Sequence, residues 1–170
     1  MGVVADFSPD IVFHAAALKH VPLLERDWGE GIKTNVFGSV NVVDATVATG
    51  AAALVMISTD KAIEPVSVLG ATKRLAEMYA QALDADFVRR AATGRPAMRL
   101  IAVRFGNVLA SNGSVVPKFK AQIEAGGPVT VTHPDMQLEP FTPGLACNLL
   151  IQNVLGANCG PPVASPGRAC

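Results

Sequence analysis

Short apolar runs alternate along the chain with longer segments of helical periodicity, and this alternation constrains the fold most. The first run, "DIVFHAAA" at 10–17, follows a turn-like "SPD", and a second run, "ALVMIS", occupies 53–58. Such runs are typical of strands buried on both faces of a parallel sheet. Helices between successive strands favour right-handed βαβ units, so we predict an α/β fold with a doubly wound parallel sheet. Strands are predicted at 10–17, 53–58, 99–110 and 128–133, and helices at 34–50, 69–91 and 115–127.

Local signals mark the ends of the two longer predicted helices. Gly50 is expected to cap the carboxyl end of the first, and Ser67 the amino end of the second. In the second helix we expect Leu75, Met78 and Leu83, or residues near them, to face the core.

Composition excludes several classes of protein. Half of the residues are hydrophobic, but no run approaches the roughly 18 uncharged apolar residues that suggest a membrane span. The first ten residues do not have the pattern of a signal peptide. Lys and Arg together equal Asp and Glu, and the chain has one Trp and one Tyr, so nothing favours binding to nucleic acid. Cys147, Cys159 and Cys170 are odd in number and widely spaced, which predicts free thiols in a reducing cytoplasm and no metal site.

The character of the sequence changes after Met136. The segment 137–170 is rich in Pro, Gly and Cys, and we expect a divergent, partly disordered tail there. The segment 1–136 carries the alternating pattern. Neither G-x-G-x-x-G nor G-x-x-G-x-x-G occurs in the chain, although a dinucleotide-binding half needs a Gly-rich turn to seat a pyrophosphate.

Polar residues follow three of the predicted strands. The segments 14–17, 58–61 and 105–107 lie where strands end, and in doubly wound sheets ligands bind beyond these carboxyl ends. Asp60 and Lys61 are adjacent, so they have the residue types to divide acid and base roles beside a substrate. An ordinary surface salt bridge explains the same pair.

Three further features each suit either a role in a site or an ordinary structural role. Lys73 lies four residues after Leu69 on one helix face, which suits either a site residue or a solvated lysine. The loop containing Asn107 and Ser114 has side chains that can bind phosphate or sugar hydroxyls, and it equally suits an ordinary turn. His14 is typical of a core histidine, and the three alanines after it leave room for a planar group.

Taken together, these stretches resemble a known family. "VFHAAALKHVPLLE", "NVFGSVNVVDA", "ISTDKA", "GATKR" and "RFGNVLASNGSVVPKFKAQI" are similar, in order and spacing, to the CapD-like polysaccharide-biosynthesis proteins. These are nucleotide-sugar 4,6-dehydratases of the UDP-N-acetylglucosamine 4,6-dehydratase type, within the extended short-chain dehydrogenase/reductase superfamily. The resemblance covers about residues 8–136 and implies a Rossmann-type parallel sheet, here without its N-terminal Gly-rich βαβ portion.

The resemblance also implies a reaction. With tightly held NAD (NADP is less expected), hydride leaves sugar C4, water is lost across C5 and C6, and hydride returns to C6. Lys61 resembles the base at C5, Asp60 the acid that helps the C6 hydroxyl leave, and Thr59 a hydrogen-bond partner near C4. Lys73 resembles the lysine that binds the nicotinamide ribose and supports the oxidation.

Further roles follow from the resemblance alone. Residues expected at the cofactor are Ala15, Ala16, Ala17, Asn35 and Ser58, and those expected at the UDP-sugar are Lys19, Asn107, Ser114 and Val115. A homo-oligomer is expected for full-length members.

The sequence departs from the family pattern at three places. Leu69 replaces the tyrosine of short members and resembles the methionine common in long, membrane-anchored ones. The Gly-rich turn is missing, and "QLEPFTPG" at 137–144 does not match the expected substrate-contacting stretch. We therefore expect this chain alone to retain no NAD and to be inactive. A nucleotide-sugar epimerase and a non-catalytic fragment or binding module are the alternatives.

Overall fold

A computed structural model describes residues 2–91, 98–108, 115–131 and 140–141. The elements, in chain order, are α1 (Gly2–Phe7), β1 (Ile11–His14), α2 (Val21–Arg26), α3 (Trp28–Gly31), the π-helical turn η1 (Ile32–Phe37), α4 (Gly38–Thr49), β2 (Ala53–Thr59), the 3₁₀ turn η2 (Asp60–Ala62), α5 (Val68–Ala91), β3 (Arg99–Phe105), β4 (Asn107–Val108), α6 (Val115–Glu124) and β5 (Pro140–Phe141).

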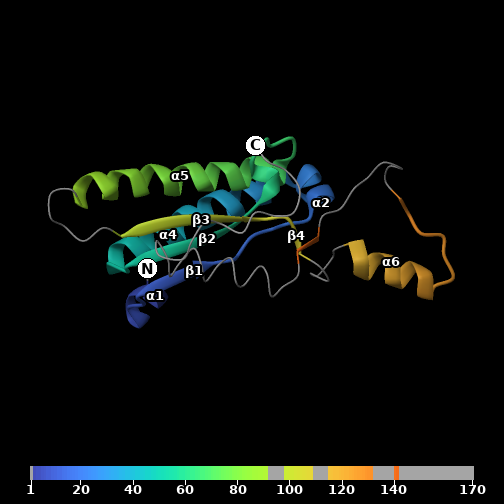
Figure 1. Ribbon diagram of the computed structural model, residues 1–170, viewed down its shortest axis with the longest axis horizontal. Helices are drawn as coiled ribbons and strands as arrows, with labels where there is room; N and C mark the ends of the chain where they lie inside the picture. Colours follow the sequence, from blue (N-terminus) through green and yellow to red (C-terminus); the bar gives the residue numbers. More distant parts are fainter. Residues whose placement is uncertain (1, 92–97, 109–114, 132–139, 142–170) are drawn as a thin grey trace.

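A parallel three-stranded sheet organises the fold (Figure 1). Its order is β1-β2-β3, with Ile11 opposite Ala53 and Ala53 opposite Arg99, so the strands start level with one another. Helix α4 connects β1 to β2, and α5 connects β2 to β3. The predicted α/β fold with a parallel sheet and flanking helices is therefore confirmed.

The main core lies between the sheet and the two connecting helices. Both helices cover the same face of the sheet, since their apolar residues join one cluster with alternate residues of β2 and with Leu100 of β3. The buried members of this cluster are Val43, Leu54, Met56, Ala76, Ala80 and Leu100. Two crossover helices on one face leave the strand ends free to form a site at a single edge.

Strand β1 differs from its prediction in burial. Phe13 is 54% exposed and Ile11 38% exposed, whereas His14 is buried. The expectation of burial on both faces is wrong for this strand. It is an edge strand of the described sheet, and α4 packs on the face opposite to Ile11 and Phe13. Strand β2, which lies in the centre, has no exposed residue: Leu54, Val55, Met56 and Ser58 are buried, and its other residues are half-buried.

Helix α5 turns a different face to the core than predicted. Leu75 and Met78 are each 51% exposed, so their expected core positions are wrong, while Leu83 does pack against the main cluster. The side facing the sheet instead carries small residues, Ala76 and Ala80, which let the helix approach the strands closely.

Both predicted helix caps are confirmed. Gly50 has a left-handed backbone with φ of 71° at the end of α4, and its N–H donates to the Val47 carbonyl. The Ser67 hydroxyl accepts from the N–H of Gly70 in the first turn of α5.

The predicted strand at 128–133 is wrong as far as the structure describes it. Residues 128–131 form no strand, and 132–133 lie outside the described residues. The segment instead folds back on α6, where Thr130 and the side chain of Gln122 exchange two hydrogen bonds. Helix α6 itself lies within the predicted range 115–127.

The predicted third strand divides into two at Gly106. Its first part is β3, and its second part, β4, pairs in parallel with β5. Apart from β5, the predicted tail at 137–170 lies outside the described residues. In the part of the chain that the structure describes, no helix has both the length and the apolarity to cross a bilayer.

Candidate active site

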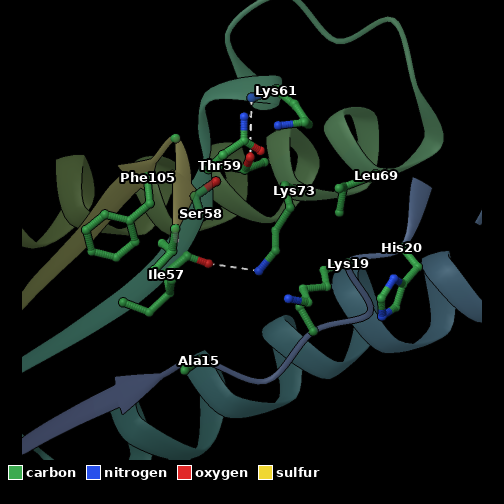
Figure 2. Close-up of a pocket in the computed structure, with 14 residues that line it drawn as sticks. Ala15, Lys19, His20, Ile57, Ser58, Thr59, Lys61, Leu69, Lys73 and Phe105 are labelled. Atoms are coloured by element: carbon green, nitrogen blue, oxygen red, sulfur yellow. Dashed lines mark hydrogen bonds between the residues drawn. The ribbon is translucent and has the colours of Figure 1, made fainter. Parts of the chain in front are cut away.

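A pocket of about 440 Å³ opens at the carboxyl ends of the three parallel strands (Figure 2). The loop after β1, the end of β2, the first turns of α5 and the residues after β3 all contribute to its wall. Eight of the residues that the sequence singled out line it: Ala15, Ala17, Lys19, Ser58, Thr59, Lys61, Lys73 and Asn107. Its size falls in the range of roughly 300–1,000 Å³ that is usual for small-molecule sites.

The turn that follows β2 holds the adjacent acid and base. Lys61 Nζ lies 3.0 Å from Asp60 Oδ1, and the same oxygen accepts from the Thr59 hydroxyl and the Lys61 N–H, each at 2.8 Å. Thr59 also caps η2 through its hydroxyl oxygen. Three donors on one oxygen fix the Asp60 carboxylate against Thr59 and Lys61. These two neighbours line the pocket, whereas Asp60 itself does not.

This hydrogen bonding keeps Asp60 ionised. Partial burial opposes its charge, but the hydrogen bonds from Thr59 and Lys61 and the charge of Lys61 outweigh burial, and the pKa of Asp60 is lowered. The side chains of Asp60 and Lys61 are 45% and 39% exposed, so the pair is half-exposed and contributes little to folding stability. Asp60 therefore accepts hydrogen bonds in this state and carries no proton to donate.

Lys73 projects from the second turn of α5 into the pocket (Figure 2). Its Nζ donates to the carbonyl of Ile57 at 2.8 Å, which ties the helix to β2. Burial lowers the pKa of Lys73, and the charge of Glu77 opposes that effect. An ammonium has three donors, so those not used for Ile57 can serve a ligand. Leu69, one turn earlier, lines the same pocket without any titratable group.

Asn35 shapes the pocket from behind. Its fully buried amide accepts from the N–H of Leu18 at 2.8 Å and donates to the Leu18 carbonyl at 3.0 Å and the Thr72 hydroxyl at 3.2 Å. Asn35 does not line the pocket. It fastens the loop after β1 to α5, and this loop carries Ala15, Ala17 and Lys19.

The remaining predicted residues are placed as follows. Ala16 is exposed and lies outside the pocket lining, and Val115 begins α6, also outside the lining. Ser114 lies outside the described residues. His14 is buried and its Nε2 lies 2.9 Å from the Ser39 hydroxyl, as in a core histidine.

Sequence reasoning missed several lining residues, among them His20, Ile57 and Val108. Phe105 and Gly106 also line the pocket, and they belong to the strand-end segment 105–107 that the sequence did identify. Each missed residue lies within three positions of such a segment, so proximity to those segments was the available signal. Among the described residues, no group of three or more His, Cys, Asp or Glu side chains is arranged to hold a metal ion.

The family to which these features belong follows from comparison with known proteins. A family model described as "Polysaccharide biosynthesis protein" matches residues 1–161. The chain belongs to this family. It is 49% identical over 150 residues to the capsular polysaccharide biosynthesis protein CapD of Staphylococcus aureus, an alignment that covers 88% of this chain. The predicted resemblance to CapD-like proteins is therefore confirmed.

Other relatives have different names. A protein named UDP-glucose 4-epimerase from Rickettsia canadensis is 44% identical over 127 residues, covering 75% of this chain and 36% of its own length. The chain spans only 24% of the length of the Staphylococcus aureus relative.

Solved structures place the fold among Rossmann-type short-chain dehydrogenase/reductase enzymes. Pen from Bacillus thuringiensis has a TM-score of 0.77 at 35% identity, with 88% of this chain and 45% of that chain covered. A dTDP-glucose 4,6-dehydratase from Streptomyces venezuelae, solved with NAD bound, also has a TM-score of 0.77 over 91% of this chain and 52% of that chain. At 20% identity the second likeness shows the fold alone.

Proposed function

We propose that this chain contributes the acid–base half of an NAD-dependent nucleotide-sugar 4,6-dehydratase, acting on a UDP-N-acetylhexosamine in polysaccharide biosynthesis. One observation carries the proposal: Lys61, which is paired with Asp60, and Lys73 both line a single pocket at the carboxyl end of β2. Loss of water from a sugar needs a base at one carbon and an acid at the next, and this pair supplies both residue types at 3.0 Å.

The residues present fit the nicotinamide end of NAD. Ala15 and Ala17 have short side chains on the pocket wall, and Lys73 offers donors for ribose hydroxyls. The Ser58 side chain is buried on the same wall, at the end of β2. The sequence contains no Gly-rich turn for the pyrophosphate, so these residues fit only part of the dinucleotide. When bound, NAD would take up a hydride and later return it.

Lys73 and Thr59 would act at the sugar C4 hydroxyl. In this proposal the Thr59 hydroxyl hydrogen-bonds the substrate near C4, and the Lys73 ammonium stabilises negative charge that develops during oxidation. Leu69 cannot take a proton, because a leucine side chain has no titratable group. The proton from the C4 hydroxyl therefore has to pass to Asp60, Lys61 or water.

A single proton shift within the pair would prepare the dehydration. In the state that the structure describes, Lys61 donates to an ionised Asp60. If the C4 proton passes to water, transfer of the Lys61 proton from Nζ to Oδ1 leaves an amine, which can remove the C5 proton, and a carboxylic acid, which can protonate the departing C6 hydroxyl. The low pKa of Asp60 makes this transfer unfavourable in the free site, so we expect it to accompany substrate binding.

The substrate's nucleotide diphosphate would lie beyond β3. Asn107 lines the pocket at this end, and Lys19 faces it from the loop after β1. Ser114 and Val115 remain proposed contacts to the same group. The proposal includes a homo-oligomeric full-length enzyme and a cytoplasmic location.

A 4-epimerase is the second candidate, because the 44% identical Rickettsia canadensis relative carries that name. Epimerisation at C4 removes and returns one hydride at the same carbon and expels no water. It therefore makes no demand for an acid–base pair at C5 and C6, which is why the Asp60–Lys61 pair favours dehydration.

A chimaera tests the proposal. The matched 150-residue segment of the Staphylococcus aureus relative would be replaced by the corresponding residues of this chain, which are 49% identical. The product formed from UDP-N-acetylglucosamine would be followed by NMR, and NAD binding by calorimetry. A 4-keto-6-deoxy product supports dehydration, and UDP-N-acetylgalactosamine without loss of water supports epimerisation. A chimaera that binds NAD but leaves the substrate unchanged would refute both.

A further inference from the structure

Glu77 is a fully buried carboxylate that the proposed reaction does not use. It lies in α5, four residues after Lys73 and therefore one helical turn along the same face. Glutamate is almost never fully buried unless it is paired. Its burial behind the pocket therefore needs a structural explanation.

Two arginines pair with this carboxylate. Arg104 of β3 donates from Nε to Oε1 at 2.9 Å and from Nη2 to Oε2 at 2.5 Å, and Arg74 donates from Nη1 to Oε2 at 3.3 Å. Burial opposes the charge of Glu77, but hydrogen bonding, above all from Arg104, outweighs it, so the pKa of Glu77 is lowered. A bidentate guanidinium–carboxylate pair also fixes geometry, because both groups are planar.

The Glu77–Arg104 pair reaches the pocket through the sheet. Arg104 is the register partner of Ser58, and Ser58 lines the pocket. The residues that follow Arg104, including Phe105 and Asn107, line it too. The pair therefore clamps α5, which carries Lys73, to the strand end from which Asn107 extends.

Glu77 also balances charge around Lys73. Burial lowers the pKa of Lys73, and Glu77 is the group that opposes this. Asp60, the nearby carboxylate in the turn after β2, already accepts three hydrogen bonds on one oxygen from Thr59 and Lys61. The other titratable groups that border Lys73 or its pocket are His14, Lys19, His20, Lys61, Arg74 and Arg104.

We propose that Glu77 is a positioning residue, which holds the Lys73 side chain in the pocket as an ammonium by its charge one turn away and by its clamp on Arg104. The inference rests on the proposed role of Lys73 at the nicotinamide ribose and the C4 hydroxyl. Glu77 touches neither substrate nor cofactor, and it acts through Lys73 and the end of β3.

The test is a titration of Lys73 in the 170-residue chain. The chain contains six lysines, so ¹³Cε-lysine labelling gives few signals, and the signal missing from Lys73→Arg assigns Lys73. Glu77→Gln keeps the shape of the side chain and removes its charge. We expect the Lys73 midpoint to fall by about one pH unit, the low end of the effect of an opposite charge nearby. Glu77→Asp should restore part of that loss.

Two further variants keep the proposal refutable. Asp86→Asn removes a carboxylate from the same helix that pairs with Arg89 and Arg90, and it should leave Lys73 unchanged. Arg74→Gln, at a partly exposed position, takes one cation from Glu77 and should raise the Lys73 midpoint even if Glu77→Gln fails to fold. An unchanged midpoint in folded Glu77→Gln, or in Arg74→Gln, overturns the proposal. Because the titration needs neither NAD nor sugar, its failure is distinct from failure of the chimaera assay.

Discussion

Gly70 offers a sharp test of how the site is held together. It lies in the first turn of α5, and a Cβ at this position would meet the carbonyl oxygen of Lys61 at 2.3 Å and the Cβ of Pro65 at 3.2 Å. Ordinary contact begins near 3.4 Å, so in Gly70→Ala the Lys61 carbonyl must retreat by about 1 Å. That atom belongs to the backbone of the turn that carries Asp60 and Lys61, and it cannot rotate away as a side chain would.

The expected cost follows from two opposing effects. Overpacking a well-packed position costs typically about 1–3 kcal/mol, and a clash with backbone belongs in the upper half of that range. Alanine is better than glycine in a helix by about 1 kcal/mol. Gly70→Ala should therefore destabilise the fold by about 1–2 kcal/mol, which lowers the melting temperature by about 2–8 °C for a chain of this size.

Thermal unfolding followed by circular dichroism measures this effect, with Gly38→Ala as the matched control. Gly38 begins α4 with helical dihedral angles, and its nearest neighbour, the Lys33 carbonyl, would lie at an ordinary 3.8 Å from a new Cβ. The control should be neutral or stabilised by up to about 1 kcal/mol. If Gly70→Ala melts at or above the temperature of Gly38→Ala, the close approach of α5 to the Lys61 turn does not constrain the protein.

Three further outcomes are expected. Lys61→Ala in the chimaera should lower dehydration by roughly 10²–10⁴-fold, while calorimetry shows unchanged NAD affinity; near-normal turnover would contradict its role as the base. Burial, aided by the charge of Lys73, lowers the pKa of His14 below 6.5, so the unfolded chain binds its proton more readily. The free energy of unfolding should therefore fall as pH drops below 6.5, and urea titrations should show a shallower fall with pH in His14→Gln. If both proteins lose stability equally as pH drops, His14 is not the group responsible. The 170-residue chain alone should show little NAD affinity by calorimetry, because it lacks a Gly-rich turn to offset an association cost of about 4–15 kcal/mol; micromolar binding would refute this.

Much of the fold could be predicted because its signals are local. Apolar runs placed the strands of the sheet, and Gly50 and Ser67 marked helix ends through contacts with residues only three positions away. The predictions that failed concern features that depend on contacts outside the predicted segment. The exposure of Phe13 follows from which strand lies at the edge of the described sheet, and the absence of strand structure at 128–131 from hydrogen bonds to Gln122.

The same division holds for the site. Thr59 and Lys61 lie at the end of a recognisable apolar strand, and ligands bind beyond the carboxyl ends of parallel strands. The amino-acid sequence alone was therefore enough to predict their place at the pocket. Glu77 gave no such sign, since a glutamate in a helix is normally solvated. Its pairing with Arg104, 27 residues away, and with Arg74 explains how the fold accommodates its buried charge.

The first turns of α5 connect these observations. Gly70 lets the helix touch the Lys61 turn, Lys73 reaches the end of β2 through Ile57, and Glu77 reaches the end of β3 through Arg104. Each contact is about one helical turn from the next, and each ties α5 to the turn or strand end that forms the pocket. A rigid helix with three such contacts holds two lysines from separate elements at one pocket without needing a tyrosine at position 69. The geometry of the acid–base pair therefore depends on helix packing as much as on the residues of the pair.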